Sequence, residues 1–77
     1  MMKWYEVDLA ESREYDYTKG DTITIAVASS VYPNADDIDD FINQTNYSFS
    51  NLKTCNIVEI DKSEEVIPYV EKIIYMN

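Results

Sequence analysis

Polar and apolar residues alternate along residues 5–17, and this pattern restricts the fold of the chain more than any other feature. Because successive side chains of a β-strand point to opposite faces, it predicts one long strand, or two collinear strands joined by a bulge near residues 11–13. Residues 18–21 follow and contain the chain's one glycine, Gly20, at a place where a tight turn needs positive φ. We therefore expect a β-hairpin at this point.

Residues 22–30 and 54–61 predict two further strands. β-branched residues dominate the first of them, as a pleated surface favours. In the second, we expect Val58 and Ile60 to face the core on the same side of the sheet as Tyr5. Together these segments predict an antiparallel sheet of three or four strands.

A helix is predicted over about residues 34–45, which include the sequence ADDIDDF. Pro33 ends the strand region before it, and either Asn34 or Asp36 can serve as the N-cap. At about 100° per residue, the isoleucines and Phe41 fall on one side of the helix, which we expect to pack on one face of the sheet. Four carboxylates fall on the other side and are expected to share a solvent face: Asp36, Asp37, Asp39 and Asp40.

The C-terminal segment leaves two alternatives open. Apolar residues recur at helical spacing along residues 66–74, which predicts a helix. Pro68 and the many β-branched residues instead favour a strand from about Tyr69. With either outcome the expected fold class is α+β, in a single compact domain over residues 1–77, because a chain this short has material for one core.

The four aspartates are a poor match for a metal site or a catalytic site. A calcium loop needs oxygen ligands at alternate positions and a glycine at its sharp turn, whereas a regular helix spreads its carboxylates outward. The chain contains no histidine, which removes the usual catalytic base and the commonest zinc ligand. Cys55, the single cysteine, has no histidine to activate it. We therefore expect no enzymatic activity, no bound metal and no cofactor.

The cellular location is predicted from the absence of export signals. The N-terminus becomes polar at once, and no apolar run approaches the roughly 20 residues that span a bilayer. A single cysteine also leaves no internal disulfide to form. We expect a cytoplasmic protein that does not contact membranes.

Acidic residues dominate the charge of the chain. Fifteen Asp and Glu against six Lys and Arg give a formal net charge of −9, while 45% of the residues are hydrophobic, which argues for a folded domain. The strands predict a second acidic surface on the sheet face opposite the helix, with Trp4 beside it. Its members are Glu6, Asp8, Glu14, Asp16, Glu59 and Asp61. Because natural surfaces usually mix both signs of charge, a face of one sign indicates a binding surface for a basic partner.

A short, Tyr-rich, histidine-free acidic chain with ADDIDDF on a helix and EYDY on a strand resembles the small inhibitors encoded by phages and mobile elements. These include anti-CRISPR proteins and other DNA mimics. The resemblance concerns size and composition over the whole chain. It implies a protein inhibitor that acts by occlusion.

Two functions follow from these observations. The first is non-catalytic binding to the basic surface of a partner, expected to be a nucleic-acid-binding protein, without direct contact to nucleic acid. The candidate contacts are Asp36, Asp37, Asp39 and Asp40 on the helix, with Glu6, Asp8, Glu14 and Asp16 as the competing patch. The alternative is a small structural or regulatory module, able to form a homo-oligomer, whose acidity serves solubility alone.

Overall fold

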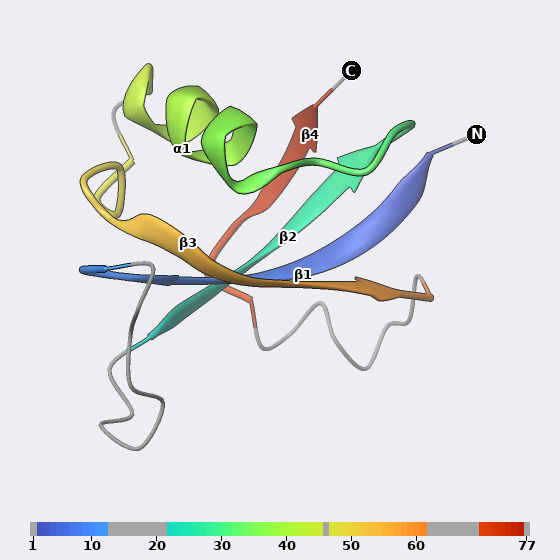
Figure 1. Cartoon of the computed structure of the whole chain (residues 1–77), viewed down its shortest axis with the longest axis horizontal. Helices are drawn as coiled ribbons and strands as arrows, with labels where there is room; N and C mark the ends of the chain where they lie inside the picture. The colour runs from blue at the N-terminus through green and yellow to red at the C-terminus, as the bar shows by residue number, and fades with distance from the viewer. Residues whose placement is uncertain (1, 13–21, 46, 62–69, 77) are drawn as a thin grey trace.

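The computed structural model describes residues 2–12, 22–45, 47–61 and 70–76. These residues form four strands and one helix, which confirms the predicted α+β class (Figure 1). In chain order the elements are β1 (Lys3–Ala10), β2 (Ile23–Ser29), α1 (Ala35–Asn43), β3 (Lys53–Ile60) and β4 (Ile73–Met76).

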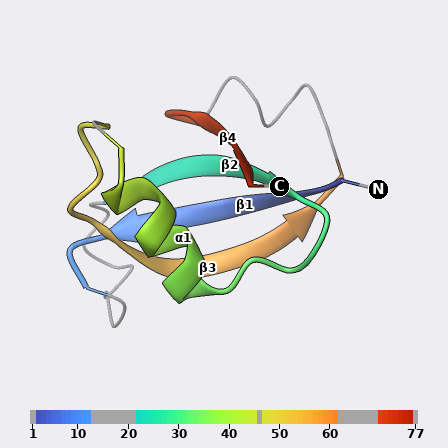
Figure 2. The same cartoon turned by 90° about the horizontal axis from the view of Figure 1, so that it is seen from above.

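The four strands form one sheet in the order β3-β1-β2-β4 (Figure 2). β1 pairs antiparallel with both β2 and β3, whereas β4 pairs in parallel with β2. The prediction of an antiparallel sheet is therefore wrong for one strand pair, and the sheet is mixed. The period-two pattern within a strand is the same whichever way the strand runs, so it carries no information about direction.

The C-terminal alternatives and the hairpin can be compared with the structure in part. Residues 73–76 form a strand, so the helical alternative is wrong for this part of the segment. β1 and β2 are antiparallel neighbours, as a hairpin requires. The predicted turn at residues 18–21, the acidic residues Glu14 and Asp16, and residues 62–69 lie outside the described residues.

Helix and sheet share one buried apolar cluster. Ile38 and Ile42 of α1 are fully buried together with residues of all the strands except β3, which contributes the partly buried Ile57. Figure 1 shows α1 lying over one side of the sheet. The strand members of the cluster are Tyr5, Val7, Leu9, Ile25, Val27 and Ile74. Burial of each large aliphatic side chain contributes about 1.5–3 kcal/mol, so this cluster is the main source of stability.

The start of α1 is fixed by Asn34. Its backbone is extended, with φ −84° and ψ 164°, and its Oδ1 accepts a hydrogen bond of 2.8 Å from the backbone N–H of Asp37. This bond satisfies one of the N–H groups that a helix leaves without an intrahelical partner. Of the two residues predicted as N-cap, Asn34 has this role and Asp36 lies in the first turn.

The side-chain orientation predicted for β3 is wrong. The pairing with β1 shifts between Asp8 and Leu9, which leaves Cys55 as an extra residue, so Thr54 and Ile57 both lie on the core side. Val58 is 46% exposed on the opposite face. Both faces of this strand carry apolar residues, so periodicity alone could not choose between them, and the β-bulge sets the outcome.

Candidate functional site

The four aspartates of α1 differ in their burial. Asp36, Asp37 and Asp40 are exposed as predicted, but Asp39 is buried, with 7% of its surface exposed. With Ile38 taken as 0° around the helix axis, Ile42 lies at about 40° and Asp39 at about 100°. Asp39 therefore stands at the edge of the apolar stripe, where the helix meets the sheet, and the prediction of four carboxylates on one solvent face is wrong for it.

Asp39 links the helix to the start of strand β3. Its Oδ1 accepts a hydrogen bond of 2.8 Å from the backbone N–H of Thr54 and another of 2.9 Å from the Thr54 hydroxyl. Thr54 is buried as well. Hydrogen bonds to a carboxylate are stronger than those between neutral groups, and leaving such buried donors without an acceptor is costly. The role of Asp39 is therefore structural.

Asp8 of the competing patch is also held within the sheet. Its Oδ1 accepts a hydrogen bond of 2.8 Å from the Thr24 hydroxyl on β2, and its Oδ2 lies 3.5 Å from Nδ2 of Asn56 on β3. The carboxylate thus joins three neighbouring strands. Part of the acceptor capacity of Asp8 is therefore used within the sheet.

The predicted acidic sheet face is not uniformly acidic over the described strands. Glu59 pairs with Tyr5 and so belongs to the other face, which leaves Glu6 and Asp8 among neutral neighbours. Glu6 lies between Val58 and Ala26.

Farther along the same face, Trp4 and Tyr75 meet edge to face across the buried Ala28, with ring centroids 5.9 Å apart. The prediction that Trp4 shares a face with acidic residues is confirmed. This face is mainly apolar at one end and polar at the other.

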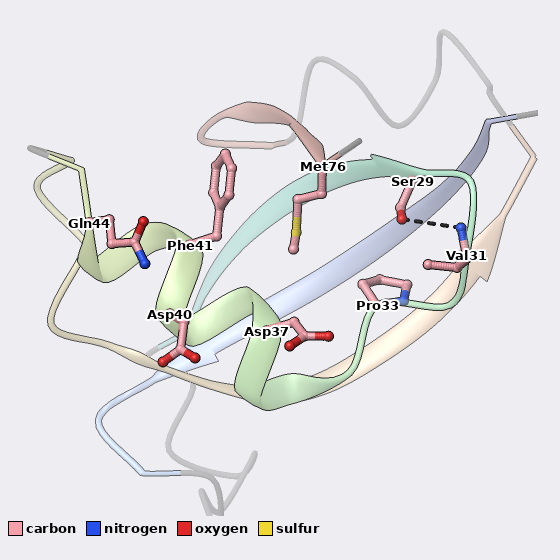
Figure 3. Close-up of a pocket in the computed structure, with 8 residues that line it drawn as sticks. All are labelled: Ser29, Val31, Pro33, Asp37, Asp40, Phe41, Gln44 and Met76. Carbon is pink, nitrogen blue, oxygen red and sulfur yellow. Dashed lines mark hydrogen bonds between the residues drawn. The ribbon is translucent and has the colours of Figure 1, made fainter.

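A groove lies beside the exposed aspartates, between α1, the end of β4 and the segment that connects β2 to α1 (Figure 3). Its volume is about 350 Å³. Figure 3 shows Met76 extending from β4 toward α1, with Phe41 on one side and Pro33 and Val31 on the other. We call this the α1 groove; it is lined by Ser29, Val31, Pro33, Asp37, Asp40, Phe41, Gln44 and Met76.

The connection before the helix adds an exposed apolar pair to this surface. Val31 is 62% exposed and Tyr32 is 61% exposed. The ring of Tyr32 packs edge to face on Tyr5, with centroids 5.6 Å apart, while the Val31 N–H donates to the Ser29 hydroxyl oxygen at 3.3 Å. These contacts hold the pair in place. Sequence reasoning missed it, although two large apolar residues directly before Pro33 were a usable signal.

The charge around the α1 groove is negative. Among the described residues that line it, two are aspartates and none is basic. Two lysines make contacts with residues that do not line the groove. Nζ of Lys3 lies 4.0 Å from Oε2 of Glu59, and Nζ of Lys72 lies 5.2 Å from the ring centre of Tyr47. Over the described part of the chain, no group of three or more acidic or cysteine residues is placed to hold a metal ion.

Comparison with family models, curated proteins and solved structures finds no match for the chain. Within the described residues, no helix has the length and apolar character needed to cross a membrane.

Proposed function

We propose that the protein is a non-catalytic inhibitor whose α1 surface occupies a basic surface of a partner protein. The observation that carries the proposal is the grouping of exposed Asp36, Asp37 and Asp40 beside the α1 groove and the exposed Val31 and Tyr32. Carboxylates supply attraction over a distance and select a basic partner. The apolar pair supplies contact area of the kind that contributes most to affinity at interfaces.

The arrangement of charge on α1 does not favour stability of the helix, and it therefore supports a role in binding. Asp36 and Asp40 are one turn apart, where like charges repel by a few tenths of a kcal/mol. The N-terminal end of the helix dipole offsets this repulsion for Asp36 and Asp37, but the effect falls off within the first turn. The described helix has no basic residue in its last turn to compensate. A basic partner surface removes the repulsion when it binds.

The partner we propose is a nucleic-acid-binding protein. Proteins that bind nucleic acid hold its phosphates on surfaces of Lys and Arg, and a group of carboxylates presents such a surface with negative charge of a similar kind. The same charge repels nucleic acid from the inhibitor itself. Occlusion of such a surface is the mode of action that the resemblance to anti-CRISPR and other DNA-mimic inhibitors implies.

Affinity capture from extracts of the native host tests the proposal. We expect the immobilised protein to retain a basic protein, and the apparent affinity for it to fall by roughly tenfold or more between 50 and 300 mM salt, because exposed charges are screened. The retained protein is identified by mass spectrometry and the affinity measured by surface plasmon resonance. Capture of an acidic or neutral protein with an affinity independent of salt would contradict the proposal.

A further inference from the structure

The α1 groove combines an apolar lining with carboxylates along one wall. Phe41, Met76 and Val31 provide the apolar part, and Asp37 projects from the helix on the side of Pro33 (Figure 3). Asp40 and Gln44 follow along the helix. A volume of about 350 Å³ is near the lower end of the roughly 300–1,000 Å³ typical of ligand pockets, so the groove suits one long side chain.

We propose that the α1 groove binds one arginine side chain of the partner, an inference that rests on the proposed function. The methylene groups of arginine match the apolar contacts offered by Met76 and Val31, and its guanidinium matches the carboxylates of Asp37 and Asp40. Side chains three residues apart on a helix have Cβ atoms roughly 5–6 Å from each other. Asp37 and Asp40 are therefore neighbours on α1, and the five N–H donors of a guanidinium can be shared between them when both carboxylates turn toward it.

Arginine fits the groove better than lysine for two reasons. Its guanidinium is planar and can stack on the ring of Phe41, which lines the groove, while its edge donates to carboxylates. It is also more weakly hydrated than an ammonium group, so its transfer from water into a partly apolar groove costs less. None of the described residues that line the groove is basic, so none of them competes with the guanidinium for the carboxylates.

The test uses N-acetyl-arginine amide as the probe, with the lysine and citrulline amides as comparisons, and follows the methyl groups of Met76 and Val31 by NMR. We expect saturable shifts with arginine in the millimolar range, at least roughly threefold weaker binding of lysine, and no saturable shifts with the uncharged citrulline. Equal responses to arginine and citrulline, or saturable shifts confined to residues outside the groove, would overturn the proposal.

Variants separate the charge of the groove from the charge of the whole chain. Asp37→Asn combined with Asp40→Asn should weaken binding of the arginine probe by at least roughly tenfold. The control, Glu11→Gln combined with Glu71→Gln, removes the same charge at exposed positions outside the groove. It should change the affinity for the probe by less than roughly twofold. Val31→Ser should weaken it by a few fold, with Val58→Ser on the far face as its control. Equal losses of affinity in the two charge variants would mean that net charge alone attracts the probe. This result would overturn the proposal that the α1 groove is an arginine site.

Parallel capture from host extract distinguishes this inference from the proposed function. If wild-type protein captures its partner but shows no saturable shifts with the arginine probe, the α1 groove is not an arginine site, and the proposed function stands. If the probe binds in the groove but no basic protein is captured, the groove binds arginine, but the proposed function fails, and with it the assignment of that arginine to a basic partner.

Discussion

Replacement of Asp39 by alanine is expected to lower the free energy of unfolding by about 2–4 kcal/mol, because it leaves the buried N–H and hydroxyl of Thr54 without this acceptor. A domain of this length has a total stability of about 4–12 kcal/mol, so the loss is large and shows as a lower midpoint of urea unfolding. Asp39→Asn should cost less, since both hydrogen bonds end on the one oxygen that asparagine retains.

Asp40→Ala is the matched control for this prediction. It removes the same side chain from the next residue of the same helix, where the aspartate is exposed. Alanine has the higher helix propensity by up to about 0.7 kcal/mol, so the control should be neutral or slightly stabilising. A similar loss of stability from both substitutions would contradict the structural role assigned to Asp39.

The second large effect concerns binding. Changing Asp36, Asp37 and Asp40 together to asparagine should weaken binding of the captured partner by roughly 100-fold, or about 2.7 kcal/mol, because three charges at the interface are lost. The free energy of unfolding should change by less than about 1 kcal/mol, since all three side chains are exposed. Surface plasmon resonance measures the first quantity and urea unfolding the second.

The control for this variant removes three charges elsewhere. Glu11, Asp61 and Glu71 are exposed and lie outside the α1 groove, and their replacement by Gln, Asn and Gln gives the same net charge as the helix variant. We expect a loss of affinity below roughly fivefold, from weaker long-range steering alone. If the control weakens binding as much as the helix variant, net charge explains the interaction and the α1 surface is not its site.

The helix could be predicted closely from the sequence because its signals are local. Pro33, the N-cap Asn34 and the spacing of Ile38 and Ile42 are all read within one segment, and the structure places α1 within the predicted bounds. The burial of Asp39 could not be read in the same way. It depends on Thr54, which is distant in sequence and meets the helix through the pairing of β3 with β1.

For the strands, too, local features could be predicted from the sequence and long-range features could not. Their positions follow from alternation, and β2 and β3 lie within one residue of the predicted ranges at each end. β1 begins two residues before the predicted range of 5–17 and ends at Ala10, and residues 13–17 lie outside the described residues. The direction of β4 and the orientation of Val58 depend on pairing and on the bulge at Cys55, which no periodicity encodes.

The α1 groove could not be predicted from the sequence. It joins Met76 to residues more than thirty positions earlier in the chain, and only the assembled fold brings them together. The exposed helix aspartates were predicted from the sequence, but the apolar surface beside them was not. The proposal of a basic partner thus comes from the charge pattern, whereas the proposed contact surface could be defined only from the fold.

The most direct test of the central claim is competition between this protein and nucleic acid for the captured partner. The apparent Kd of this protein for the captured partner is measured by surface plasmon resonance at increasing concentrations of a mixed-sequence DNA duplex or RNA. We predict that the apparent Kd rises linearly with the concentration of the nucleic acid that the partner binds, because under the proposal both compete for one basic surface. A ternary complex, in which the partner, the nucleic acid and this protein are bound together with the Kd unchanged, would contradict the claim.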